Sequence, residues 1–395
     1  MISKRPAEFE KPDLLRHYFD WAATAMPDSP ADAMPAIDDS LFGNPSSMHR
    51  EGRAARDALE AARARCAGVL GVPPDTLYFT SGGTEANCIP LYSCLIRQGA
   101  GRTVASLGEH SSVTGNLKNL ERMGKKIGFI PVDSSGRVTP DLLAQTLEKH
   151  PDTRFAAIMA VNNETGTIND IAALRDVLRP AKGSPVHLHC DMAQAAGKVP
   201  LDIAGWGVDS ASLSGHKIGA PRGIGLLYLR KPIDALCMGG GQERKVRSGT
   251  ENVAGAMALA ACLENRALPE NLGVESERAR LRWKRLLGAL KGIDRCQLIP
   301  ASRGIDDDGF SPYIAQASFK DVPGEVMTRA LDDLGFAVST GAACSSAAPE
   351  RPVLAAMGIA DNVSLEGIRV SQGWSTCDDE IDGLLAAIAE VLKFL

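Results

Sequence analysis

Residues 186–217 read VHLHCDMAQAAGKVPLDIAGWGVDSASLSGHK, and this stretch decides the fold. It contains two short apolar runs, VHLHC and DSASL, which are typical of buried strands. Polar residues follow each run directly: Asp191 and Gln194 follow the first, and Ser214, His216 and Lys217 follow the second. Such a pattern is typical of parallel strands whose carboxyl ends carry a binding site.

Three further apolar runs have the same arrangement. TLYFT precedes SGGTEAN, which contains Gly83 and Thr84; TVASL is followed by His110, and FAAIMAV by Asn163. Because ligands of open α/β sheets bind outside the carboxyl ends of the strands, these groups are expected to converge on one pocket. The run GIGLLYL follows Lys217 too closely for a helical crossover, so it is predicted to lie antiparallel to its neighbour.

The 395 residues exceed the usual size of one domain. Residues 18–263 alternate strand-like and helical patterns, which predicts an α/β domain with a mostly parallel sheet flanked by helices. One of these helices, RAARDALEAARARCAGVL, shows an apolar stripe at helical spacing, formed by Ala55, Leu59, Ala62, Cys66 and Val69.

From residue 264 the pattern changes to a charged helix, strands around AQASF, FAVST and GIRVS, and a closing helix. Residues 264–395, completed by residues 1–17, are therefore predicted to form a smaller α+β domain.

The composition excludes several classes of protein. The net charge of −5 gives no reason to expect a nucleic acid or an anionic membrane as partner. The N-terminus lacks a continuous apolar segment, and the longest apolar run, VAGAMALAACL, is too short to span a bilayer, so a soluble cytoplasmic protein is expected. Nine cysteines without any C-x-x-C pair suggest neither a disulfide framework nor a zinc site.

Two other local patterns suggest different chemistry. His187, His189 and Cys190 are possible metal ligands, but strand alternation puts the two histidines on one face and Cys190 on the other, so no metal site is predicted. Ser214 and Lys217 satisfy S-x-x-K, the signature of acyl-serine enzymes, but the S-D-N and K-T-G motifs that should accompany it are missing from the sequence.

The polar groups at the strand ends suit one cofactor, pyridoxal 5'-phosphate. Lys217 could form an imine with its aldehyde, and Asp191 could keep its ring nitrogen protonated. The turn with Gly83 and Thr84 opens a helix whose N-terminus favours a phosphate. Four other residues could complete the set: Ser214 and His216 as phosphate donors, His110 against the ring, and Gln194 on the phenolic oxygen.

In these motifs the chain resembles the cysteine desulfurases, pyridoxal-phosphate enzymes of the class-V aminotransferase group with the NifS/IscS type of sequence. The similarity rests on SLSGHKIGAPRGIGLLYL, HCDMAQAAGK, GGGQERKVRSGTEN, FGNPSSMHREG, YFTSGGTEAN, LGEHSSV, MAVNNETGTI and VSTGAACSS, in the family's order. The resemblance implies the fold of type-I pyridoxal-phosphate enzymes. One departure is Lys245, which stands where the family commonly has glycine.

Carried over position by position, the resemblance assigns a role to each matching residue. Lys217 would bind the cofactor covalently, with Asp191 and Gln194 on its ring, Gly83, Thr84, Ser214 and His216 at its phosphate, and His110 stacked on it and moving protons. Asn163 and Arg369 would hold the substrate carboxylate. Thr250 would reach the phosphate of the neighbouring subunit, which implies a homodimer.

Cys344 lies in STGAACSSAAPERP, where small neighbours favour access over burial. In the family the matching thiolate attacks the substrate's sulfur, so L-cysteine would become L-alanine and Cys344 would keep a persulfide. The persulfide would pass to an acceptor protein, such as an iron–sulfur cluster scaffold. The alternatives are a selenocysteine lyase or other β-eliminating lyase, and a non-catalytic sulfur-carrier or assembly protein.

Overall fold

The computed structural model describes residues 16–27, 41–96, 101–179, 185–341 and 351–395. A seven-stranded sheet with the order β2-β8-β7-β6-β5-β3-β4 forms the centre of its larger part. The strands are β2 (Leu77–Thr80), β3 (Arg102–Ser106), β4 (Ile127–Ile130), β5 (Thr153–Ala157), β6 (His187–Asp191), β7 (Ser210–Ser214) and β8 (Gly225–Leu229). Within this sheet only β8 runs against the others. The predicted α/β class and the antiparallel GIGLLYL strand are therefore confirmed.

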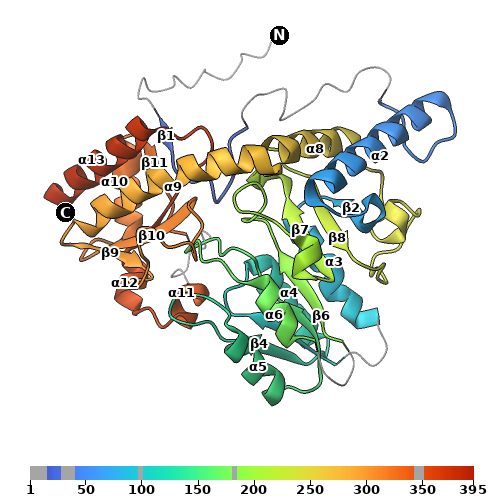
Figure 1. Ribbon diagram of the computed structural model, residues 1–395, viewed down its shortest axis with the longest axis horizontal. Helices are drawn as coiled ribbons and strands as arrows, with labels where there is room; N and C mark the ends of the chain where they lie inside the picture. Colours follow the sequence, from blue (N-terminus) through green and yellow to red (C-terminus); the bar gives the residue numbers. More distant parts are fainter. Residues whose placement is uncertain (1–15, 28–40, 97–100, 180–184, 342–350) are drawn as a thin grey trace, which may run out of the picture.

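Helices flank this sheet, as Figure 1 shows. They are α2 (Arg50–Leu70), α3 (Gly83–Ile96), α4 (Ser111–Arg122), α5 (Pro140–Lys149), α6 (Ile171–Val177), α7 (Ile203–Trp206) and α8 (Val253–Ala267). Four residues of the stripe predicted on α2 are buried, namely Ala55, Leu59, Ala62 and Cys66. Val69 is only half-buried, because the last turn of α2 buries Leu70 instead.

A second, three-stranded antiparallel sheet has the order β12-β10-β9. Its strands are β9 (Cys296–Ile299), β10 (Ile314–Phe319) and β12 (Gly367–Ser371), and its helices are α9 (Pro269–Lys291), α10 (Gly324–Asp333), α11 (Pro352–Ala356), α12 (Asp361–Glu366) and α13 (Asp378–Phe394). The strand predicted around FAVST is confirmed, but it is short. Only β11 (Phe336–Ala337) is a strand there, and it pairs with β1 (His17–Tyr18) because the N-terminal segment lies beside it.

Each sheet has its own hydrophobic core. Residues such as Leu59, Ile158 and Leu213 belong to the core around the large sheet. Phe19, Trp283 and the other members of the second core pack around the small sheet. Helices α8 and α9 follow one another along the top of the view in Figure 1 and join the two parts. The domain boundary at residue 264 stays a prediction.

No helix in the described ranges is both long enough and apolar enough to cross a membrane.

A buried ion pair anchors the loop that follows β8. The Arg63 guanidinium donates to both carboxylate oxygens of Glu243, at 2.7 and 2.8 Å, and Glu243 also accepts the backbone N–H of Phe79 at 2.8 Å. Glu243, Arg244 and Lys245 have φ angles of 44°, 53° and 69°, a left-handed conformation that L-residues adopt at a cost. The ion pair therefore holds a strained turn in place.

Replacing Lys245 by glycine should relieve part of this strain. Because Lys245 is exposed and glycine adopts positive φ freely, Lys245→Gly is expected to raise the free energy of unfolding by about 1 kcal/mol. Urea denaturation measures the difference. Lys245→Ala is the matched control, since alanine meets the same backbone restriction; a glycine variant no more stable than the alanine variant would contradict the interpretation.

Candidate active site

A cavity of about 850 Å³ lies at the carboxyl ends of strands of the large sheet and extends to β12 of the small sheet. Ten of the residues singled out in the sequence line it: Gly83, Thr84, His110, Asn163, Asp191, Gln194, Ser214, His216, Lys217 and Arg369. The common direction of β2, β3, β5, β6 and β7 brings most of them together. Thr250 is exposed and does not line this cavity, and Cys344 lies outside the described residues.

Lys217 ends a short 3-10 helix, Gly215–Lys217, that directly follows β7. Its Nζ donates to the carbonyl oxygens of Ala22 and Ala23, at 2.6 and 2.7 Å. Burial, followed by the positive charge of Arg369, lowers the pKa of Lys217 to about 8. About a tenth of the amine is therefore uncharged and nucleophilic at pH 7, far more than for a lysine with the ordinary pKa.

Asn87 links the groups at the floor of the cavity. Its Nδ2 donates to Asp191 Oδ2 at 2.7 Å and to Ser112 Oγ at 2.9 Å. Its Oδ1 lies 2.8 Å from Nε2 of His189 and accepts from the Ser212 hydroxyl. The amide thus fixes the Asp191 carboxylate. Asn87 was not among the site residues predicted from the sequence, although it ends the SGGTEAN motif one helical turn after Gly83.

His110 caps the N-terminus of α4, which fixes the orientation of its ring. Its Nδ1 accepts the backbone N–H of Ser112 at 3.1 Å, so a neutral ring carries its proton on Nε2. Burial is the main cause that lowers the pKa of His110, and the Lys217 charge lowers it further against the opposing effect of Asp191. The uncharged imidazole is therefore favoured.

The turns that follow β2 and β7 meet in the lining of the cavity. A Cβ on Gly83 would lie 3.1 Å from the Ser214 Cβ, so glycine permits the close approach of the turns after β2 and β7. Gly83 and Thr84 begin α3, whose free backbone N–H groups suit an anion. His216, with Nδ1 2.7 Å from Thr24 Oγ1, has its pKa lowered to about 4 by burial and by Lys217. It is therefore a neutral ring.

A buried lysine orients Gln194. Lys198 Nζ donates to Gln194 Oε1 at 2.6 Å, and Gln194 Nε2 donates at 2.8 Å to the Ala22 carbonyl that also binds Lys217. Burial, followed by the charges of Lys217 and Arg369, lowers the pKa of Lys198 to about 7. In its charged form the Nζ only donates, so it orients the amide oxygen of Gln194 toward itself. Lys198 was not among the predicted site residues, though its position four residues after Gln194 was a usable signal.

Arg369 on β12 faces the cavity from the small sheet. It donates to the Asn163 carbonyl at 3.0 Å and to Asp20 Oδ1 at 2.7 Å, while its Nε is buried and unpartnered within the described chain. A guanidinium with a free donor in a cavity can bind a carboxylate.

Two acids with raised pKa values also line the cavity. Burial, with a smaller contribution from Asp191, raises the pKa of Glu109 to about 8, and burial raises that of Glu164 to about 7 against the charges of Arg369 and Arg351. In each the Oε2 atom is buried without a partner in the described chain. These carboxyl groups can hold protons at neutral pH. Both glutamates follow apolar runs in the sequence, Glu109 after TVASL and Glu164 after FAAIMAV, but the strand-end pattern alone assigned them no role.

The two histidines considered as metal ligands have other neighbours. His187 Nε2 and His189 Nδ1 both lie 2.8 Å from Ser210 Oγ. Burial lowers the pKa of His189 to about 3. Across the residues that the structure describes, no group of three or more His, Cys, Asp or Glu side chains is arranged to hold a metal ion.

Comparison with known proteins was made against families, curated sequences and solved structures. Residues 17–384 match the family model "Aminotransferase class-V". A "NifS/IcsS protein homolog" of Lactobacillus delbrueckii subsp. bulgaricus is 36% identical over 384 residues, which are 95% of this chain and 97% of that protein. "Cysteine desulfurase IscS" of Escherichia coli O139:H28 is 37% identical, over 87% of this chain and 84% of the relative. A solved "NifS-like protein" superposes with a TM-score of 0.86 at 32% identity, covering 96% of this chain and all of the other.

The depressed pKa of Lys217 can be tested by chemical labelling. In protein freed of bound small molecules, the reductive methylation rate of Lys217, followed by peptide mass spectrometry, should rise with a midpoint near pH 8, since only the uncharged amine reacts. Arg369→Gln should move this midpoint to higher pH because it removes a charge that opposes protonation. The methylation rate of an exposed lysine such as Lys320, in the same sample, shows how the reactivity of the reagent itself changes with pH. An unchanged midpoint for Lys217 in the Arg369→Gln variant would refute the electrostatic contribution of Arg369.

Proposed function

The chain belongs to the class-V aminotransferase family as a cysteine desulfurase, and from this premise we propose that it binds pyridoxal 5'-phosphate on Lys217 and transfers the sulfur of L-cysteine to Cys344. The observation that carries the proposal is the half-buried Lys217 amine, with its pKa lowered to about 8, in one cavity with Asp191 and the Gly83–Thr84 turn.

Residues that line the cavity match each functional group of this cofactor. Lys217 would take its aldehyde, and Asp191, fixed by Asn87 at 2.7 Å, would face its ring nitrogen. The backbone at Gly83 and Thr84, with Ser214 and His216, would bind its phosphate. Gln194, held by Lys198, would contact its phenolic oxygen. When bound, the cofactor supplies an electron-withdrawing ring that makes the substrate Cα–H acidic and the Cβ–S bond cleavable.

The protein's own groups would bind the substrate and handle its protons. Arg369, supported by Asp20, would bind the substrate carboxylate next to Asn163. Lys217 can accept a proton at Nζ, and His110, with Nδ1 bound by the Ser112 N–H, has Nε2 left to exchange a proton in the cavity.

Cys344 would accept the sulfur as a thiolate. In the net reaction a bond forms between Cys344 Sγ and the substrate sulfur, the substrate Cβ–S bond breaks, and the carbon skeleton gains a proton and leaves as L-alanine. The persulfide would then pass to a thiol of an acceptor protein. Among the other cysteines, burial raises the pKa of Cys66 and Cys296 to about 12, which makes them poor nucleophiles at neutral pH.

A homodimer completes the proposal. The resemblance implies that Thr250 binds the phosphate of the cofactor held by the neighbouring subunit. In its own chain Thr250 is exposed on a loop and does not line the cavity. Arg247 ties this loop to the SGGT turn through Glu85, at 3.2 Å.

Attachment of the cofactor to Lys217 has a direct chemical test. The purified protein should show a visible absorption band that borohydride abolishes, and peptide mass spectrometry should then find the reduced cofactor on Lys217. Lys217→Ala should lose both the covalent adduct and turnover. Reduction of the cofactor onto any other lysine of the wild-type protein would refute the assignment.

The sulfur-accepting role of Cys344 is tested by substitution. Cys344→Ala should lower alanine formation from L-cysteine at least 100-fold and abolish protein-bound persulfide, while the cofactor spectrum stays as in the wild type. Cys237→Ala and Cys377→Ala are matched controls, because both thiols are exposed. Undiminished turnover of cysteine by Cys344→Ala would exclude the persulfide route, and preserved turnover of selenocysteine alone would favour a lyase for that substrate.

A further inference from the structure

Arg303 lies at the contact between the two sheets, 2% exposed, and binds backbone on both sides of it. Nη1 donates to the carbonyl oxygens of Thr165 and Ile314, at 3.0 and 2.8 Å, and Nη2 donates to that of Ser311 at 3.1 Å. Thr165 belongs to the turn after β5, whereas Ile314 begins β10. One guanidinium therefore connects the large sheet's strand-end turn with the small sheet.

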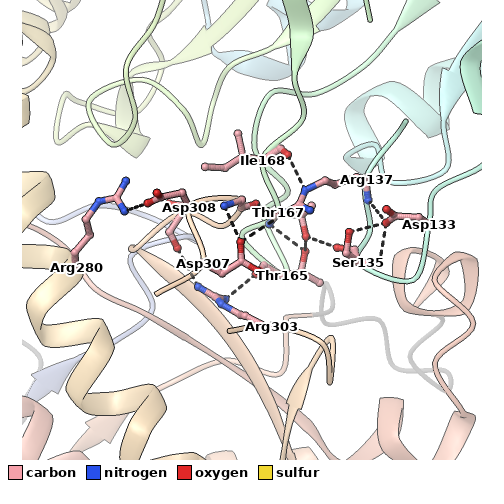
Figure 2. A network of polar contacts seen from close by, with 12 residues as sticks. Asp133, Ser135, Arg137, Thr165, Thr167, Ile168, Arg280, Arg303, Asp307 and Asp308 are labelled. Atoms are coloured by element: carbon pink, nitrogen blue, oxygen red, sulfur yellow. Dashed lines mark hydrogen bonds and ion pairs between the residues drawn. The ribbon is translucent and has the colours of Figure 1, made fainter. Parts of the chain in front are cut away.

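Figure 2 shows the polar network around this residue. Arg137 donates to the Gly309 carbonyl at 2.8 Å and to that of Ile168 at 3.3 Å. The guanidinium carbons of Arg137 and Arg303 lie 5.1 and 4.7 Å from the centroid of the Phe310 ring. Phe310 also forms an antiparallel bridge with Thr167. These contacts bind the 303–314 segment to the turn.

The turn itself is rigid. Asn162 Oδ1 accepts the backbone N–H groups of Glu164 and Thr165, each at 2.9 Å. Gly166 has a φ of 78°, and a Cβ there would lie 2.6 Å from the Ile314 carbonyl oxygen. Movement at Thr165 must therefore also move Asn163, two residues earlier.

The two segments that Arg303 connects, the 162–167 turn and β10, each contact a residue of the proposed carboxylate site. On one side the turn carries Asn163, whose carbonyl accepts from Arg369 at 3.0 Å. On the other side β10 pairs with β12 in a register that sets Gln316 opposite Arg369. Arg303 therefore holds the turn that carries Asn163 against the strand that pairs with β12, together with backbone hydrogen bonds from Ser311 to Gly166 at 2.7 Å and from Ile168 to Gly309 at 2.9 Å.

The guanidinium group of Arg303 suits this arrangement better than other side chains would. Burial lowers the pKa of Arg303 to about 9, so its burial is costly. Among the described residues its hydrogen bonds go to carbonyl oxygens and it forms no ion pair with a carboxylate within 4.0 Å. A planar fork can reach three carbonyls at once, which a lysine ammonium on a flexible stem does less well.

We propose that Arg303 is a positioning residue for the substrate carboxylate, because it clamps the 162–167 turn to β10 and so sets the spacing of Asn163 and Arg369. The inference rests on the proposed function, in which those two residues bind the carboxylate. It predicts a defect that is selective for ligands bearing a carboxylate.

The test compares L-alanine with L-alaninamide, which lacks the carboxylate, as ligands of the holoenzyme followed by the change in cofactor absorption. Arg303→Met should weaken binding of L-alanine on the order of tenfold and of L-alaninamide less than about twofold, and should raise KM for L-cysteine more than it lowers kcat. Arg303→Lys should give a smaller effect in the same direction. Equal loss for both ligands in the two folded variants would overturn the proposal.

Two further variants distinguish a failure of the Arg303 proposal from a failure of the proposed carboxylate site. Arg280→Ala removes the exposed Arg280–Asp308 pair of the same contact and should leave both affinities unchanged. Arg369→Gln should remove the preference for L-alanine; if it does not, the proposed carboxylate site is wrong, independently of Arg303. If Arg303→Met fails to fold in a thermal melt, Arg303→Lys still decides, and an Arg303→Lys protein with wild-type selectivity would overturn the proposal.

Discussion

The desolvation of the half-buried Lys217 amine beside Arg369 governs the chemistry of the site. Desolvation and the neighbouring guanidinium both lower its pKa, and the carbonyl oxygens of Ala22 and Ala23 accept its N–H groups. Lys217 itself follows β7, whereas Arg369 lies on β12 of the other sheet and Ala22 and Ala23 belong to the segment after β1. The reactive state of Lys217 therefore exists only when both sheets and the N-terminal segment are assembled.

Residues behind the cavity keep its polar groups in one arrangement. Asn87 uses both ends of its amide to connect Asp191, Ser112, His189 and Ser212. Lys198 does the same for Gln194 by fixing the direction of that amide. Because a buried polar group without a partner is costly, such networks are rigid once complete. The cavity is thus prepared for its ligand by side chains that need not touch it.

Much of the large sheet was predictable, because each strand is a local apolar run followed by polar residues at its carboxyl end. The direction of β8 also followed from the short distance between Lys217 and GIGLLYL. The small sheet was harder. FAVST has strand composition, but its pairing is divided: Phe336 and Ala337 pair with β1, more than three hundred residues earlier, and Ser339 forms an antiparallel bridge with Arg369 of β12. A segment far away in sequence decided that pairing.

The chemistry available to the protein can be recognised in the sequence alone: one lysine, one aspartate and a glycine turn at the ends of three strands, and a cysteine among small residues. These features are local, so short motifs carry them. Only the tertiary structure decided how the groups act on one another. The lowered pKa of Lys217, the raised pKa of Glu109 and the bond from Arg303 to Thr165, 138 residues apart, depend on burial and on contacts between sheets. Burial and long-range contacts leave no fixed spacing in the chain, because they arise from the packing of elements rather than from neighbouring residues.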